Sequence, residues 1–248
     1  GSANERINVQ LGGLSITGGK IITANGGGIL VQDSDVKCPG CNIYSNTVYN
    51  PDGGGGNGGG FCIEGESTAA FINCHISMNK AFYGGGVSIQ GGNGTSFVSC
   101  QFVSNQASGF PDLNGGGGGG VFINISATVS FARCEITSNQ AYYGNGGGVA
   151  IVSAGDASFT HCEITHGGAA DGGNVFTQAP AGVFLQASFA SCRISDGFSG
   201  GYGGGGVFIR NHGRGTVSFA SRSEEHPSEL QSPVPIPFPA SSLKKKNN

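Results

Sequence analysis

The sequence predicts an all-β fold, a single-stranded parallel β-helix (β-solenoid) of about seven coils, and three observations support this prediction. Glycine makes up 49 of the 248 residues, about 20% against a usual share near 7%. A glycine run followed by alternating apolar residues recurs along the chain, and a second module containing cysteine follows most copies. Apolar residues alternate with a period of two inside both modules, which is typical of strands rather than helices.

The first module is a run of glycines followed by apolar-x-apolar. Its copies begin at Gly26, Gly58, Gly84, Gly118, Gly146, Gly172 and Gly204. The copy at Gly172 is weaker, because Asn174 stands in place of its third glycine. Glycine adopts positive φ freely and lets neighbouring backbones approach closely, so the run predicts a tight turn in every unit.

The second module reads Phe-x-x-Cys-x-Ile/Phe-x-x-Asn. Cys38 replaces phenylalanine in the first copy, and Gly167 and Gly197 replace asparagine in two later copies. The phenylalanine and the cysteine are three residues apart, which breaks the alternation, so the chain must bend between them for both to face inward. Each unit is therefore expected to hold two or three short strands that are joined at bends and closed by the glycine turn.

The unit length narrows the choice of repeat fold. The phenylalanines at 71, 97, 131, 159 and 189 are 26 to 34 residues apart. Glycine runs and β-branched alternation oppose helical repeats, and a propeller blade needs about 40 residues. A solenoid fits, with one coil per unit stacked about 4.8 Å above the last. We expect residues 1–25 to form a partial coil or cap and residues 26–221 to form the repeats.

These motifs resemble those of a known family. Glycine runs paired with Phe102-Val103-Ser104-Asn105, and with isoleucine in place of phenylalanine in other copies, resemble polymorphic outer membrane protein repeats. More broadly, they resemble right-handed parallel β-helix proteins of the pectate-lyase-like type, over about residues 26–221. The resemblance implies a right-handed coil and an extracellular or cell-surface location.

That scaffold supports unrelated functions, so the resemblance leaves three hypotheses open. The first is adhesion, structural presentation or glycan binding, in which a polysaccharide or a cell-surface glycan is the partner. The second is a polysaccharide lyase or glycoside hydrolase. The third is an inert structural spacer.

Residues 222–248 do not follow the repeat, because Arg222 stands where the next cysteine is expected. Residues 222–232 resemble the in-frame translation of a common sequencing-adapter oligonucleotide, and the final Lys-Lys-Lys-Asn-Asn fits an A-rich read end. The alternative is a natural proline-rich linker with a basic tip. We interpret 222–248 as a disordered, non-native tail. A coil end without a cap would expose a sheet edge and favour end-to-end self-association.

The net charge argues against nucleic acid as a partner, and the hydropathy argues against a membrane-spanning helix. The formal net charge is −3 and the isoelectric point is about 5.9, so no basic field is available for nucleic acid. No stretch reaches the roughly 20 apolar residues of a membrane-spanning helix.

The cysteines form a column at the inward parity, which predicts a ladder of small buried side chains. Its members are Cys41, Cys74, Cys100, Cys134, Cys162 and Cys192. Cys38-Pro39-Gly40-Cys41 is a C-x-x-C motif, which elsewhere binds zinc or performs redox chemistry. No second pair has ligand spacing, so no metal site is predicted here, and a local disulfide between Cys38 and Cys41 stays open.

Charged residues at the outward parity are the candidates for catalysis. Glu135, Glu163 and Arg193 occupy one column, and Arg133 and His161 lie just before it. Stacking would bring them onto neighbouring coils, where paired carboxylates beside a basic group can serve acid–base chemistry or hold a cation. The alternative is a solvated face on which the charges compensate one another.

Aromatic residues near the glycine turns are the candidates for ligand binding. Tyr83, Tyr142, Tyr143 and Tyr202 would lie in register along one edge, where flat rings could stack on sugars. The alternative is that they cap the apolar corner of each turn. No cofactor is predicted. Asp33-Ser34-Asp35 could contribute to calcium binding, but a lone Asp-x-Asp in a polar loop is usually only a turn.

Overall fold

The computed structural model describes residues 7–49, 55–92, 94–109, 117–124, 128–152, 156–201, 203–211 and 213–221. The predicted tail at 222–248 lies outside these residues and stays a prediction. The described strands form four parallel sheets, which we name A to D.

The strands of each sheet follow in stacking order. Sheet A contains β1 (Asn8–Gln10), β5 (Asp35–Pro39), β9 (Thr68–Ile72), β13 (Thr95–Val98), β17 (Val129–Ala132), β21 (Asp156–Thr160), β25 (Phe184–Ala190) and β29 (Arg214–Ala220). Sheet B contains β2 (Ser15–Thr17), β6 (Asn42–Tyr44), β10 (His75–Ser77), β14 (Gln101–Val103), β18 (Glu135–Thr137), β22 (Glu163–Thr165) and β26 (Arg193–Ser195). Sheet C contains β3 (Lys20–Ile22), β7 (Thr47–Tyr49), β11 (Lys80–Ala81), β15 (Gln106–Ala107), β19 (Gln140–Asn145), β23 (Gly168–Asp171) and β27 (Phe198–Ser199). Sheet D contains β4 (Ile29–Gln32), β8 (Phe61–Glu64), β12 (Val87–Ile89), β16 (Val121–Ile123), β20 (Val149–Ile151), β24 (Val175–Ala179) and β28 (Val207–Asn211).

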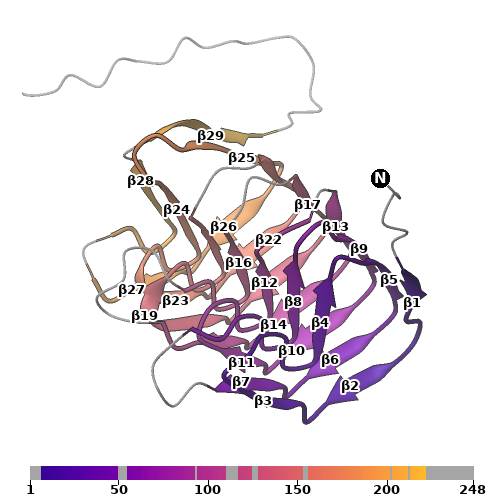
Figure 1. Cartoon of the computed structure of the whole chain (residues 1–248). Helices are drawn as coiled ribbons and strands as arrows, with labels where there is room; N and C mark the ends of the chain where they lie inside the picture. Colours follow the sequence, from indigo (N-terminus) through magenta and orange to yellow (C-terminus); the bar gives the residue numbers. More distant parts are fainter. Residues whose placement is uncertain are drawn as a thin grey trace, which may run out of the picture.

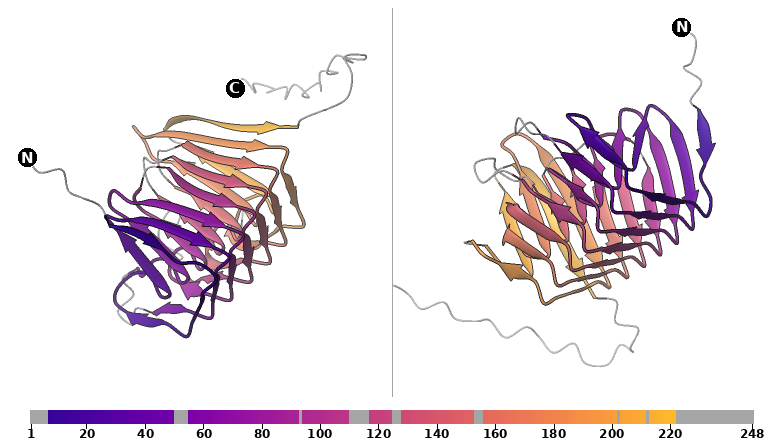
Figure 2. Two further views of the ribbon diagram at one scale, coloured as in Figure 1. Left: turned by 90° about the vertical axis from the view of Figure 1, so that its right-hand side faces the viewer. Right: turned by 90° about the horizontal axis from the view of Figure 1, so that it is seen from below.

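The chain visits the four sheets in turn, so each full coil contributes one strand to every sheet (Figure 1). Seven strands in three sheets and eight in the fourth confirm the predicted parallel β-helix of about seven coils. Figure 2 shows the coils stacked in sequence order, from indigo to yellow. The expectation of two or three strands per unit was wrong, because a coil holds four.

A single residue in the left-handed conformation makes each of the two bends around sheet B. The bend between sheets A and B lies directly before the cysteine, with φ between 52° and 53° at Asn73, Ser99, Arg133, His161 and Ser191. In the first copy Gly40 takes this place, with φ of 66°. The second bend lies directly before the asparagine position, at Ser45, Met78, Ser104, Ser138, His166 and Asp196. These bends explain how phenylalanine and cysteine, three residues apart, both face inward.

The glycine run makes the turn from sheet C to sheet D. Gly84 has a φ of 62°, and the next two glycines approach the adjacent coil too closely for any side chain. A Cβ atom on Gly85 would lie 2.4 Å from the carbonyl oxygen of Gln106, and one on Gly86 would lie 2.6 Å from that of Gly120. The first glycine is therefore needed for its conformation and the next two for their lack of volume.

In-register columns of identical side chains form the core. The rings of Phe71, Phe97, Phe131, Phe159 and Phe189 are nearly parallel, and neighbouring centroids are 4.6–4.7 Å apart. The predicted cysteine ladder lies beside this stack: five of its six members are buried, and Cys192 is half-buried. Each thiol from Cys100 onward donates to a carbonyl oxygen of the preceding coil, as Cys134 does to Phe97 at 3.4 Å.

An asparagine ladder holds the corner between sheets B and C. The Asn105 Oδ1 atom accepts hydrogen bonds from both the backbone N–H and the Nδ2 of Asn79, each at 3.1 Å. Asn105 Nδ2 in turn donates to the Oδ1 of Asn139 at 3.0 Å and to the carbonyl of Ile76 at 2.9 Å. Asn46, Asn79, Asn105 and Asn139 are fully buried, so the ladder satisfies backbone groups that water cannot reach.

Asn174 continues this ladder from the opposite wall of the coil. Where the asparagine column changes to Gly167 and Gly197, the Asn174 Oδ1 accepts the backbone N–H of Gly167 at 2.7 Å. Its Nδ2 donates to the carbonyl of Ser195 at 2.7 Å. Two departures from the repeat therefore compensate each other. Glycine replaces asparagine at the corner between sheets B and C, and Asn174 in the glycine turn supplies a side-chain amide in its place.

We predict that Asn105→Ala lowers the free energy of unfolding by about 3 kcal/mol or more, because several buried hydrogen-bonding groups lose their partner at a cost of about 1–3 kcal/mol each. The control is Gln106→Ala at the next position, which is only half-buried and should cost less than about 0.5 kcal/mol. Denaturant unfolding followed by circular dichroism measures both. Equal losses in the two variants would contradict the role given to the ladder.

Candidate functional site

The structure brings three of the five predicted catalytic residues together on the outer face of sheet B. Glu135, Glu163 and Arg193 are in-register partners on β18, β22 and β26. Glu163 Oε1 forms an ion pair with Arg193 Nη1 at 3.1 Å, with 48% of the Glu163 side chain and 68% of the Arg193 side chain exposed. Glu135 Oε2 accepts a hydrogen bond from Gln101 Nε2 at 3.0 Å, and Gln101 Oε1 lies 3.1 Å from His75 Nδ1.

Arg133 and His161 lie apart from this row, at the bends that precede β18 and β22. Both are exposed and both adopt the left-handed conformation that turns the chain from sheet A to sheet B. Their backbone N–H groups bond to the carbonyls of Thr160 and Ala190 in the following coil. The described geometry therefore gives both residues a role in the fold. The charged row on sheet B is a solvated face with an exposed ion pair, which is worth little stability.

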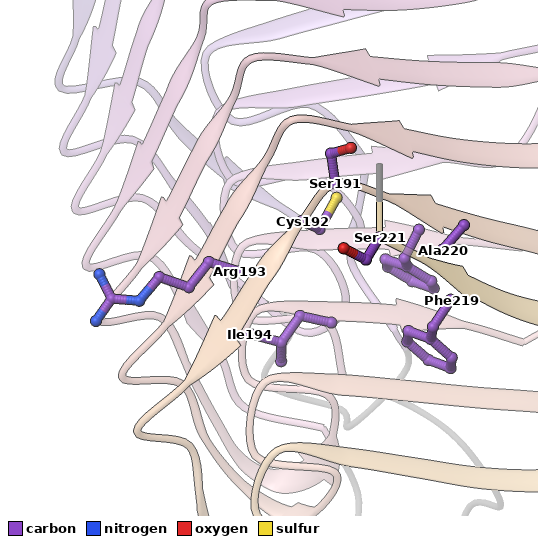
Figure 3. Close-up of a pocket in the computed structure, with 8 residues that line it drawn as sticks. Ser191, Cys192, Arg193, Ile194, Phe219, Ala220 and Ser221 are labelled. Carbon is purple, nitrogen blue, oxygen red and sulfur yellow. The ribbon is translucent and has the colours of Figure 1, made fainter. Parts of the chain in front are cut away.

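Cavities among the described residues include two away from Glu135 and Glu163, and Arg193 is among the residues that line one of them. One of about 410 Å³ lies on the outer face of sheet A and is lined by residues such as Asn8, Asp35 and Thr68. The other, of about 570 Å³, is lined by Phe189, Cys192, Ile194 and Phe219, among others (Figure 3). These four side chains belong to the core columns of the last described coils, and Figure 3 shows Arg193 pointing away from them. Neither cavity is lined by Glu135 or Glu163.

The predicted aromatic residues have two different environments. Tyr142 and Tyr143, on β19, are 58% and 62% exposed. Tyr83 instead packs on Phe122 on the outer face of sheet D, with ring centroids 5.1 Å apart, and burial raises the pKa of its phenol. This packing is what the alternative interpretation, an aromatic cap on an apolar corner, predicts for Tyr83. Tyr202 lies outside the described residues.

Sequence reasoning missed a further exposed aromatic residue on sheet C, Tyr49. Tyr49 ends β7 on sheet C and is 56% exposed, and its in-register partner Ile22 is 57% exposed. The half-buried Phe82 follows β11 of the same sheet. We name Tyr49, Phe82, Tyr142 and Tyr143 the aromatic strip. Tyr49 could have been found from its parity, because it lies two residues after Thr47, just as Phe82 follows Lys80 and Tyr142 follows Gln140.

A polar column lies beside the aromatic strip on the same sheet. Thr47, Lys80, Gln106 and Gln140 are in-register partners, and none of the four is buried. The outer surface of sheet C thus combines flat apolar rings with hydroxyl, amide and ammonium groups. Such a surface can make both apolar contacts and hydrogen bonds with a ligand.

The C-x-x-C motif gains a third thiol in three dimensions. The sulfur atoms of Cys38, Cys41 and Cys74 all lie within 4.8 Å of one another, and all three residues are buried. The contact with Cys74, and then burial, raises the pKa of Cys38, whereas contacts with Cys100 and Cys38 lower the pKa of Cys74. All three cysteines are free thiols, and the disulfide between Cys38 and Cys41 that the sequence left open is not formed in this structure.

The Asp33-Ser34-Asp35 segment forms a turn that joins two coils. Asp33 has a φ of 48°, and its Oδ1 accepts the backbone N–H of Glu66 at 3.0 Å. The Ser34 hydroxyl donates to the carbonyl of Gln32 at 2.9 Å. These contacts occupy part of the segment in coil-to-coil bonding, and calcium binding there stays untested.

Comparison with known proteins supports the architecture and adds no activity. Residues 7–114 match the family model described as right handed beta helix region. No curated protein and no solved structure matches the chain. The match and the sheet topology together show a right-handed parallel β-helix, which is consistent with the resemblance to the pectate-lyase-like superfamily. Among the described residues, no helix has the length and apolar character needed to cross a membrane.

We predict that Tyr83→Ala lowers the free energy of unfolding by about 1–3 kcal/mol, because it removes a packed ring. Tyr142→Ala should change it by less than about 0.5 kcal/mol, since its ring is mostly in solvent. Thermal and denaturant unfolding of the two variants test this difference. If Tyr142→Ala proved as destabilising as Tyr83→Ala, the assignment of Tyr142 to an exposed surface would be wrong.

Proposed function

We propose that this β-helix is a cell-surface or secreted protein that binds an extended polysaccharide or cell-surface glycan through the aromatic strip on sheet C, without cleaving it. The observation that carries the proposal is the exposure of Tyr49, Tyr142 and Tyr143, each more than half accessible, on the outer edge of one sheet. Large exposed apolar groups gathered on one face are typical of interaction sites. The location rests on the family resemblance.

The spacing of the strip suits a linear ligand. Tyr49 and Tyr142 belong to β7 and β19, which are separated in sheet C by β11 and β15. At about 4.8 Å per coil the two tyrosines are about 14 Å apart along the rod. A glycan chain lying parallel to the rod axis would stack on Tyr49, Phe82 and Tyr142, and would pass Ser108 in the coil between Phe82 and Tyr142. Its hydroxyl groups would then face the polar column of Thr47, Lys80, Gln106 and Gln140.

Binding without cleavage is favoured because the carboxylates lie on another sheet. Glu135 and Glu163 belong to sheet B, whereas the aromatic strip belongs to sheet C. Glu163 is also engaged in an exposed ion pair with Arg193, which suits a surface on which charges compensate one another.

A polysaccharide lyase or glycoside hydrolase is the second candidate. The in-register pairing of Glu135 with Glu163, beside Arg193, favours it, since two neighbouring carboxylates are the usual catalytic pair of glycoside hydrolases. An inert spacer is the third hypothesis, and it predicts neither binding nor release of sugar ends. All three can be separated in one experiment.

We predict that the full chain is retained on at least one insoluble polysaccharide from a panel that includes plant, algal and bacterial polymers. Tyr142→Ala with Tyr143→Ala should weaken retention about tenfold, because each stacked ring is worth about 0.5–1.5 kcal/mol. Depletion binding isotherms measure the affinity, and a reducing-end assay on the same samples measures cleavage.

The matched control is Phe184→Ala, which removes an aromatic ring of similar exposure, 54%, from sheet A. Its affinity should equal that of the unmodified protein. Equal loss in the control and in the tyrosine variant would place binding elsewhere. New sugar ends that disappear with Glu135→Gln or Glu163→Gln would establish the enzyme instead, and no retention on any polymer would favour the spacer.

A further inference from the structure

Three buried thiols meet at the corner between sheets A and B. Cys38 lies on β5, Cys41 directly precedes β6, and Cys74 directly precedes β10 in the next coil. Their sulfur atoms lie within 4.8 Å of one another, and the three residues are 0–2% exposed. We name them the thiol triad.

The triad exists because one coil departs from the repeat. From the next coil onward the position in register with Cys38 holds a phenylalanine, starting with Phe71, so each of those corners has one cysteine beside one ring. Cys38 replaces that ring with a thiol, and Gly40 makes the bend that returns Cys41 to the interior. The register of sheet B then places Cys74 beside Cys41, because their neighbours His75 and Asn42 are partners.

We propose that the thiol triad binds a single monovalent copper ion in a three-coordinate, all-sulfur site. Thiolate ligands select soft ions such as Cu(I) and zinc. Metal–sulfur bonds of about 2.3 Å put the sulfurs of a trigonal site about 4 Å apart, so small rotations of the side chains would close the triad around an ion. This site is independent of the proposed glycan-binding surface, which lies on the outside of sheet C.

The number of ligands favours copper over zinc. A structural zinc ion takes four ligands in a tetrahedron. In the described part of the chain the triad is the group whose ligand atoms converge, and its members belong to the apolar core, with Phe71 and Ile43 in the same cluster. Cys100 contacts Cys74 but does not belong to the group, and neither does a carboxylate or an imidazole. An apolar wall also offers little support for a water ligand. Three-coordinate Cu(I) needs no fourth ligand.

Binding exchanges protons for metal and leaves the oxidation state unchanged. Cys41 Sγ now donates to the carbonyl of Leu11 at 2.9 Å, and Cys74 Sγ donates to the carbonyl of Cys38 at 2.8 Å. Each thiol would lose its proton to solvent as its sulfur bonds to Cu(I), and these hydrogen bonds would break. No electron is transferred, so no oxidant or reductant is consumed.

The test is a titration of the reduced full chain with Cu(I), supplied as its acetonitrile complex without oxygen, in competition with a chromogenic Cu(I) chelator. We expect one equivalent to be withheld from the chelator. Cys38→Ala and Cys74→Ala should each weaken this binding at least tenfold. The matched control is Cys134→Ala, which removes an equally buried thiol from the same ladder and should leave binding unchanged. Circular dichroism verifies that each variant is folded.

A second measurement does not depend on the chelator. One equivalent of Cu(I) should raise the melting temperature of the unmodified protein and of Cys134→Ala, and should leave that of Cys38→Ala unchanged, because only a folded triad binds the ion. Several outcomes would overturn the proposal: no withheld copper, equal loss in Cys134→Ala, full binding in Cys38→Ala, or tighter binding of Zn²⁺ than of Cu(I) in the same competition.

Discussion

Parallel strands in register place each side chain about 4.8 Å from its counterpart in the next coil, and every column of this protein must be compatible with that distance. Rings meet the requirement by lying parallel, as Phe131 and Phe159 do with centroids 4.6 Å apart. Asparagines meet it by donating to the next amide oxygen, and thiols by packing as small apolar groups that donate to carbonyls of the preceding coil. The left-handed bends preserve these columns, because a corner made by one residue turns every coil at the same place.

Much of the fold could be predicted from the sequence, because the residues that form each column recur at the same position of every repeat. The spacing of phenylalanine and cysteine predicted the bend between sheets A and B, whereas the bend before the asparagine was not predicted. The strand that each coil contributes to sheet C was missed, because strands of two residues such as Lys80–Ala81 and Gln106–Ala107 are too short to show an alternation of apolar and polar residues. The substitution of Asn174 for a glycine and the loss of asparagine at Gly167 were both visible. Their connection requires knowing that the glycine turn and the sheet B–C corner face each other inside the coil.

The candidate sites were predictable to the extent that they follow register. Glu135, Glu163 and Arg193 do so, and the structure places them side by side. Tyr83 differs from Tyr142 because its ring turns onto Phe122, which depends on side-chain packing rather than on spacing. The third thiol of the triad followed from register as well: Cys41 and Cys74 share a column, and Cys38 occupies the adjacent one. The four outer faces also differ in character, from serines such as Ser130 and Ser158 on sheet A to the rings on sheet C.

The asparagine that continues the ladder from the glycine turn limits how this rod can change in length. Coils with an asparagine at the corner between sheets B and C, such as those of Asn79 and Asn105, make the same hydrogen bonds to the coil before and the coil after. Recombination could therefore duplicate or delete such a coil, and the neighbouring coils would still find hydrogen-bond partners. Asn174 instead serves Gly167 in its own coil and Ser195 in the next. These two coils must be inherited together, because a crossover between them would separate the Asn174 Nδ2 group from the Ser195 carbonyl that accepts its hydrogen bond. Elongation by coil duplication is therefore open in the first half of the rod and constrained in the second.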